Sequence, residues 1–193
     1  MAKSLLFVCS LNGGRSVASE YLFRVMLQQR DERLAHQVKV ASAGLITKED
    51  VEWMQGFGVP IHNPAFGRPP YRSLIPVMLK RGIDLSAYRS KGLKRPMVEE
   101  ADLIVVFDEY PPFRKAAILS FWPQAEDKVF TFREFVEAEV KGECLVTEDP
   151  YTAPYADEVF IDFPAEFLEA NIAEIEAYLA QKMAKFLRYL QQS

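Results

Sequence analysis

Only two cysteines occur among the 193 residues, Cys9 and Cys144, and they lie far apart. Small secreted domains that are held by disulfides carry many more. No apolar stretch approaches the roughly 20 residues that a transmembrane helix needs. The short apolar run near the start leads directly into a polar, glycine-containing segment, so it is interpreted as a buried strand and not as a signal peptide. These features favour a cytoplasmic protein without a membrane partner.

The sequence also lacks a large excess of charge of one sign. Lys and Arg number 23 and Asp and Glu number 27, which gives a formal net charge of −4. The longest basic cluster, at 91–95, is short and is interpreted as solvated surface, so no nucleic acid is expected as a partner. Because 49% of the residues are hydrophobic, the chain suffices for one domain with a full core. We expect a single domain over 1–193, with longer loops at about 46–72 and 131–148.

Hydrophobic patterning predicts strands that alternate with helices. Strands are predicted at 4–8, 38–42, 101–107 and 128–130. Helices are predicted at about 15–33, 73–81, 111–120 and 164–190. A turn is expected at 42–44, and the glycines and prolines of 46–72 predict a long irregular loop. The alternation predicts an α/β fold, a three-layer doubly wound sheet of about four parallel strands with helices on both faces.

The first predicted strand leads directly into a segment whose composition suits anion binding: Cys9, Ser10, Leu11, Asn12, Gly13, Gly14, Arg15 and Ser16. The backbone N–H groups of a glycine-containing loop that closes onto a helix N-terminus form a cradle for phosphate. In doubly wound sheets, ligands bind beyond the carboxyl ends of the strands, which is where this loop begins. The segment 9–16 is therefore predicted to be a phosphate-binding loop.

The side chains of this loop have complementary chemistry. The positive field of the cradle favours the thiolate form of Cys9, which is the nucleophilic form. Arg15 can hold two phosphate oxygens and stabilise the charge of the transition state. Ser16 can donate a hydrogen bond to the sulfur, and Asn12 tolerates unusual backbone angles. The alternative, a buried core thiol and a surface arginine, accounts less well for a position between strand and helix.

The loop resembles that of the low-molecular-weight protein tyrosine phosphatases, a family that shares its fold with thioredoxin-coupled arsenate reductases and bacterial protein-arginine phosphatases. The resemblance continues along the chain in the same order. It includes Ser42-Ala43-Gly44, Gly82-Ile83-Asp84-Leu85, Arg89-Ser90, the segment 101–105 with Asp108, and Asp149-Pro150-Tyr151.

The resemblance implies a phosphomonoester hydrolase that forms a phosphocysteine intermediate on Cys9. It implies a phosphotyrosine protein or a small aryl phosphate as substrate, inhibition by phosphate or vanadate, and no metal or cofactor. Asp149 would be the general acid. Tyr151 would be a wall of the substrate cleft. Trp53 is a second candidate wall, or else a packing anchor of its own loop.

Three loop residues depart from the family pattern. Leu11 stands where the family usually has glycine, and a positive φ there would cost about 1–2 kcal/mol. Gly14 stands where a second cysteine is frequent. Gly13 replaces a larger side chain that helps to select tyrosine or arginine substrates, so the substrate stays open. Gly13 and Gly14 are expected to give the loop the conformational freedom it needs.

Two alternatives to a phosphatase stay open: an arsenate reductase, and a catalytically weak phosphate-binding regulatory protein. Arsenate reduction needs a second thiol to resolve the modified Cys9. The segment 82–95, where related reductases carry a cysteine pair, contains none. Cys144 is the only other thiol, and a reversible Cys9–Cys144 disulfide remains an open prediction.

Overall fold

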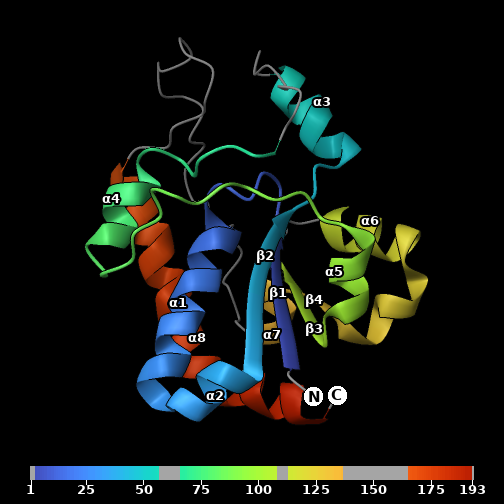
Figure 1. Ribbon diagram of the computed structural model, residues 1–193. Helices are drawn as coiled ribbons and strands as arrows, with labels where there is room; N and C mark the ends of the chain where they lie inside the picture. The colour runs from blue at the N-terminus through green and yellow to red at the C-terminus, as the bar shows by residue number, and fades with distance from the viewer. Residues whose placement is uncertain (1–2, 57–65, 108–112, 137–164, 193) are drawn as a thin grey trace.

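A sheet of four parallel strands forms the centre of the protein (Figure 1). The computed structural model describes residues 3–56, 66–107, 113–136 and 165–192. The strands lie in the order β2-β1-β3-β4, with bounds β1 (Lys3–Cys9), β2 (Val38–Gly44), β3 (Leu103–Val106) and β4 (Val129–Thr131). Because the chain passes from β1 to one side and then returns to the other, the carboxyl end of β1 is the topological switch point, where ligands bind in such sheets.

Helices cover both faces of the sheet (Figure 1). Leu5 and Phe7 of β1 point into one core with α1 (Arg15–Arg30) and α8 (Ala165–Gln192). The intervening residues Leu6 and Val8 point into a second core with α5 (Arg95–Glu100) and α6 (Phe113–Phe121). This alternation along one strand produces the three layers, and the predicted doubly wound α/β fold is confirmed.

Shorter elements connect these layers. They are α2 (Glu32–Gln37), α3 (Lys48–Gly56), α4 (Leu74–Leu79), the 3₁₀ helix η1 (Pro123–Lys128) and α7 (Phe132–Val136). The predicted helix at 15–33 is interrupted at Asp31, whose side chain accepts a hydrogen bond from the N–H of Arg33 and so begins α2. Helix α5 was not predicted from the sequence.

The core beneath the predicted phosphate loop is aromatic. The rings of Phe7 and Phe23 lie 6.0 Å apart between centroids, and Phe186 lies 5.1 Å from Phe23 and 4.5 Å from Phe135. All four side chains are less than 2% exposed, and burial of each contributes about 1.5–3 kcal/mol. These rings bind β1, α1, α7 and α8 together, so the strand and the helix that border the loop have fixed positions.

The prediction of an irregular segment over 46–72 is wrong for residues 48–56, which form α3. The helix begins with a capping box formed by Thr47 and Asp50. The N–H of Asp50 donates to Thr47 Oγ1 at 3.2 Å, and the N–H of Thr47 donates to Asp50 Oδ2 at 2.8 Å. These two bonds start the helix despite the glycines and prolines that follow it. Trp53 therefore lies in a helix and not in an irregular loop.

The prediction of a turn at Ser42-Ala43-Gly44 is also wrong, because all three residues belong to β2. Ser42 pairs with Phe7, and Gly44 pairs with Cys9. A Cβ atom on Gly44 would lie 2.6 Å from the carbonyl oxygen of Ser10, so glycine permits the strand to pass this close to the loop. β2 thus places Ser42 next to the predicted phosphate loop.

Candidate active site

The segment 9–16 spans the short gap between the carboxyl end of β1 and the amino end of α1. The carbonyl of Cys9 accepts a hydrogen bond from the N–H of Leu45 at 2.8 Å, which ties the start of the loop to the end of β2. The carbonyl of Gly14 accepts from Ala18 at 3.0 Å and so opens α1, whose first residue is Arg15. The N–H groups at this helix end have no partner within the helix, which is the basis of an anion cradle.

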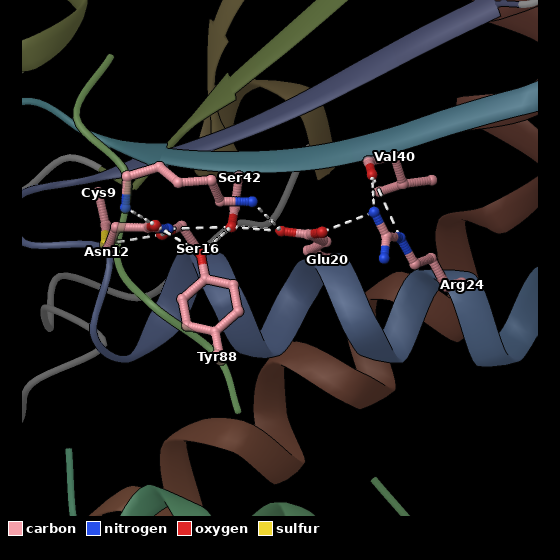
Figure 2. Close-up of polar contacts among 9 residues, drawn as sticks. Cys9, Asn12, Ser16, Glu20, Arg24, Val40, Ser42 and Tyr88 are labelled. Carbon is pink, nitrogen blue, oxygen red and sulfur yellow. Dashed lines mark hydrogen bonds and ion pairs between the residues drawn. The ribbon is translucent and has the colours of Figure 1, made fainter. Parts of the chain in front are cut away.

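A chain of hydrogen bonds connects the nucleophile candidate to the inside of the loop (Figure 2). Cys9 Sγ lies 2.9 Å from Ser16 Oγ, and Asn12 Nδ2 donates to the same Ser16 oxygen at 2.9 Å. Because Ser16 Oγ accepts from Asn12, its own hydrogen can be directed at the sulfur. A hydroxyl donor in this position stabilises negative charge on sulfur.

Asn12 is the centre of this arrangement. Its φ of 54° is the only positive φ of a non-glycine residue among the residues described. Nδ2 donates to Ser16 Oγ and to Ser42 Oγ, each at 2.9 Å, while Oδ1 accepts from Tyr88 at 2.5 Å and from the N–H of Lys91 at 2.8 Å. The amide therefore uses both of its N–H groups and both acceptor sites of its oxygen. The expected tolerance of Asn12 for unusual angles agrees with this conformation, and the partners explain why it persists.

A buried carboxylate lies beyond Ser42, on the side away from Asn12 (Figure 2). Glu20 is 1% exposed and accepts a hydrogen bond from Ser42 Oγ at 2.5 Å. Arg24 Nη2 lies 2.7 Å from its other oxygen, and Lys91 Nζ lies 3.5 Å from the first. Two cations thus compensate a charge that would be costly to bury alone. The hydrogen-bond network thus extends from the Cys9 sulfur through the loop to Glu20 and Arg24 in α1.

Tyr88 closes the network from the opposite side. Its hydroxyl donates to Asn12 Oδ1 and lies 3.1 Å from Ser42 Oγ. Burial raises the pKa of the Tyr88 phenol well above its usual value. The phenol therefore stays protonated, and stays a donor, throughout the physiological pH range.

The sequence analysis missed all the residues that support Asn12 from outside the loop. A local signal exists for two of them, because Ser16, Glu20 and Arg24 recur every four residues and so share one face of α1. No comparable signal marks Tyr88 or Lys91, which reach the loop from a distant part of the chain.

The two loop glycines have a role beyond the conformational freedom expected of them. The ring of Tyr71 lies on Gly13 and Gly14, and the N–H of Tyr71 donates to the carbonyl of Gly13 at 3.0 Å. A Cβ on Gly14 would lie 2.8 Å from Tyr71 Cε2, closer than real side chains approach. Neither glycine has a positive φ, so the glycines provide room for the ring. The cost expected for Leu11 does not arise, because its φ is not positive either.

The structure brings Cys9, Arg15 and Ser16 together around one loop. Arg15 lies with its guanidinium carbon 6.0 Å from the ring centre of Phe107, at the end of β3. Ser10 and Leu11 are half-buried at the edge of the loop. Asp108, Cys144, Asp149 and Tyr151 lie outside the described residues, as does the side chain of Trp53. Within the described ranges, no group of three or more His, Cys, Asp or Glu side chains could hold a metal ion.

The comparisons with known proteins agree with this geometry. The family model of the low molecular weight phosphotyrosine protein phosphatases matches residues 58–192. The chain belongs to this family. The matched range begins after the loop at 9–16, so the assignment is independent of the cysteine loop. This protein is therefore a phosphatase by family, and the prediction of a hydrolase is confirmed.

Solved structures of related phosphatases cover nearly the whole chain. A low molecular weight protein tyrosine phosphatase from T. tengcongensis is 25% identical, with a TM-score of 0.65 over 95% of this chain and 99% of its own. The YwlE arginine phosphatase from Geobacillus stearothermophilus is 22% identical, with a TM-score of 0.62 over 98% and 96%. Wzb from Vibrio vulnificus, solved with benzylphosphonate, is 20% identical, with a TM-score of 0.62 over 96% and 99%. The last two show the fold alone. No curated protein sequence matches the chain.

No helix within the described part of this phosphatase has both the length and the apolar character needed to cross a membrane.

Substitution Gly14→Ala should impair this phosphatase through contact of the new methyl group with the ring of Tyr71. The new Cβ would lie 2.8 Å from Tyr71 Cε2 and 3.1 Å from Tyr71 Cδ2, so either the ring or the loop has to shift. We expect a loss of about 1–3 kcal/mol in unfolding free energy and a lower kcat/KM for an aryl phosphate. Chemical denaturation and steady-state kinetics measure both.

The control is the same substitution in a Tyr71→Ala background, where the space is free. The double variant should then be no worse than Tyr71→Ala alone. Equal losses from Gly14→Ala in both backgrounds would show that the ring is not the cause.

Substitution Tyr88→Phe should weaken the support of Asn12. It removes the donor to Asn12 Oδ1, and a weakened buried network costs about 1–3 kcal/mol. We expect that loss in unfolding free energy, together with a lower kcat. Tyr21→Phe is the matched control, because the Tyr21 ring packs edge-on against Tyr88 at 5.9 Å without joining the network. Similar effects of the two substitutions would contradict the role of the Tyr88 hydroxyl.

Proposed function

We propose that this phosphatase hydrolyses phosphotyrosine in proteins through a phosphocysteine intermediate on Cys9. The main observation is the contact of 2.9 Å between Cys9 Sγ and Ser16 Oγ, inside a loop that joins a strand to a helix N-terminus. A sulfur in that position lies beside a helix N-terminus, where a phosphate group can bind within reach of it.

The first step forms the bond between Cys9 sulfur and phosphorus and breaks the bond between phosphorus and the ester oxygen. Arg15 and the loop N–H groups hold the equatorial oxygens. Asp149, assigned from the sequence, gives its proton to the leaving oxygen, so the alcohol leaves neutral.

The second step returns the enzyme to its starting state. Asp149, now a carboxylate, accepts a proton from water as the water oxygen attacks phosphorus. The bond between phosphorus and sulfur breaks, and the hydroxyl of Ser16 stabilises the departing thiolate. Inorganic phosphate is released and should compete with substrate at the same loop, as should vanadate.

An aromatic substrate is supported by the family and by the surroundings of the loop. Tyr71 places an aromatic ring beside Gly13 and Gly14, in the space that a larger loop side chain would fill. Wzb, a neighbour in fold, was solved with benzylphosphonate, an aromatic phosphonate. Tyr151 and Trp53 remain proposed as further walls of the cleft on the sequence alone.

Arsenate reduction is not favoured by any observation. It needs a second thiol near Cys9. The loop has glycine at position 14, and Cys9 is the only cysteine within the ranges that the structure describes.

Substitution Cys9→Ser should abolish hydrolysis of p-nitrophenyl phosphate, because a hydroxyl is far less nucleophilic than a thiolate in this cradle. The variant should keep the fold and the loop, and so should still bind vanadate. Kinetics, circular dichroism and vanadate titration by calorimetry measure the three properties. Turnover retained in a folded variant would exclude Cys9 as the nucleophile.

Substitution Asp149→Asn should slow hydrolysis in a way that depends on the leaving group. For a poor leaving group such as phenol we expect kcat to fall by about 10²–10⁴, because protonation of the oxygen is lost. For p-nitrophenol, which leaves without a proton, the fall should be much smaller. Equal losses on the two substrates would contradict the assignment of Asp149 as the acid.

A further inference from the structure

The region that lies next to the phosphate loop has a net positive charge, whereas the whole protein has a net negative charge. Residues 66–95 contain eight Lys and Arg and one acidic residue, Asp84, whereas the formal net charge of the chain is −4. The basic cluster at 91–95, interpreted from the sequence as solvated surface, is one part of this region. The fold brings the other part next to it.

Two extended segments, 66–72 and 88–94, lie side by side across the end of the sheet where β1 and β2 end (Figure 1). The N–H of Gly67 donates to the carbonyl of Ser90 at 2.8 Å, and the N–H of Ser90 donates to the carbonyl of Arg68 at 2.7 Å. Charges that are distant in the sequence are therefore neighbours in the structure.

Both segments are attached directly to the phosphate loop. The N–H of Tyr71 binds the carbonyl of Gly13, and the N–H of Lys91 binds Oδ1 of Asn12. The basic residues that flank these attachment points therefore border the cradle. We define the basic rim as Arg68, Arg72, Arg89, Lys91 and Lys94.

The remaining basic residues of this region serve the fold. Lys80 and Arg81 form ion pairs with Glu169 of α8, and Arg95 pairs with Glu99 within α5. Within the rim, Lys91 also contacts the buried Glu20. Arg72 and Lys94 differ from these, because both are exposed and no acidic side chain of the described residues pairs with them. Their charges are directed at solvent beside the site.

The length of the rim favours an extended chain over a compact anion. Arg68 and Arg72 lie on one of the two segments, and Arg89, Lys91 and Lys94 lie on the other. Charges that are distributed over two neighbouring segments match acidic side chains along a peptide. Cations near a binding site also raise the local concentration of an anionic partner, and salt screens this effect.

We propose that the basic rim docks an acidic segment of the phosphoprotein substrate, with Asp or Glu residues next to the phosphorylated residue. This inference rests on the proposed function, since it names the substrate class for the same site. The cradle and Cys9 act on the phosphate group, while Arg72 and Lys94 select the surrounding sequence.

The test compares one double charge reversal with a matched control. Arg72→Glu/Lys94→Glu alters the rim without touching the loop or the network around Asn12. Arg33→Glu/Arg188→Glu makes the same change in net charge in α2 and near the end of α8, which lie at the opposite end of the sheet (Figure 1). Arg33 and Arg188 are also exposed. The substrates are two phosphotyrosine peptides of equal length, with Glu or with Gln around the phosphotyrosine, and p-nitrophenyl phosphate.

The unaltered protein should prefer the Glu peptide by about tenfold in kcat/KM at low salt, mainly through KM, and the preference should shrink as salt is raised. The rim variant should lose about tenfold on the Glu peptide and less than twofold on p-nitrophenyl phosphate. The control variant should behave like the unaltered protein. Anisotropy of labelled phosphopeptides bound to the Cys9→Ser protein gives the same comparison without turnover.

Three results would overturn the proposal: no preference for the Glu peptide, an equal loss on all three substrates, or an equal loss in the control variant. A fourth would be faster turnover of every substrate by the rim variant. That result would mean that the rim holds an acidic part of this chain itself, such as 137–164, which has eight acidic residues and one basic. Failure of the proposed function is distinguished by p-nitrophenyl phosphate, which would then not be hydrolysed by any variant.

Discussion

The left-handed backbone at Asn12, held by four side-chain hydrogen bonds, is the constraint on which the geometry of the phosphate loop depends. A positive φ is unfavourable for an ordinary residue, and asparagine adopts it at lower cost than most. Here the amide gains partners from α1, β2 and the segment 88–91 in return. The hydrogen bonds of the protein itself therefore hold the shape of the loop, and such preorganisation is what the proposed binding of phosphate requires.

The hydrogen-bond network joins the candidate nucleophile at one end to a buried carboxylate at the other. It begins at the sulfur of Cys9, passes through hydroxyl and amide groups, and ends at the buried Glu20 with its two cations. A carboxylate at the far end orients the Ser42 hydroxyl away from Asn12, which leaves the Ser42 oxygen free to accept from the amide. The charge in α1 thus determines the orientation of donors in the loop, although it does not touch the sulfur.

The surroundings of the loop add an aromatic ring and positive charges to this network. Small residues at 13 and 14 leave room for the ring of Tyr71, which arrives from a separate segment. The same segment and its neighbour carry the basic rim. The predicted phosphate loop is thereby placed among an aromatic ring and positive charges, which in our proposal act on the rest of the substrate.

The sequence alone determined the α/β class and the parallel strands, which the structure confirms, and it predicted the phosphate loop, because each depends on residues that are adjacent in the chain. Apolar runs define strands, and the order strand, Cys9, glycines, Arg15, helix defines an anion site. The capping box of Thr47 and Asp50 is equally local and was overlooked only because of the glycines and prolines that follow it. In contrast, most hydrogen-bond partners of the Asn12 side chain are distant in the sequence. Ser42, Tyr88 and Lys91 lie 30, 76 and 79 residues away in the chain. The spacing of hydrophobic residues indicates which face of a helix or strand is buried. It does not indicate which polar groups meet at the end of a sheet. That meeting, like the contact of Tyr71 with Gly14, was decided by tertiary structure, because buried polar groups must find partners wherever the packing of strands and helices brings them.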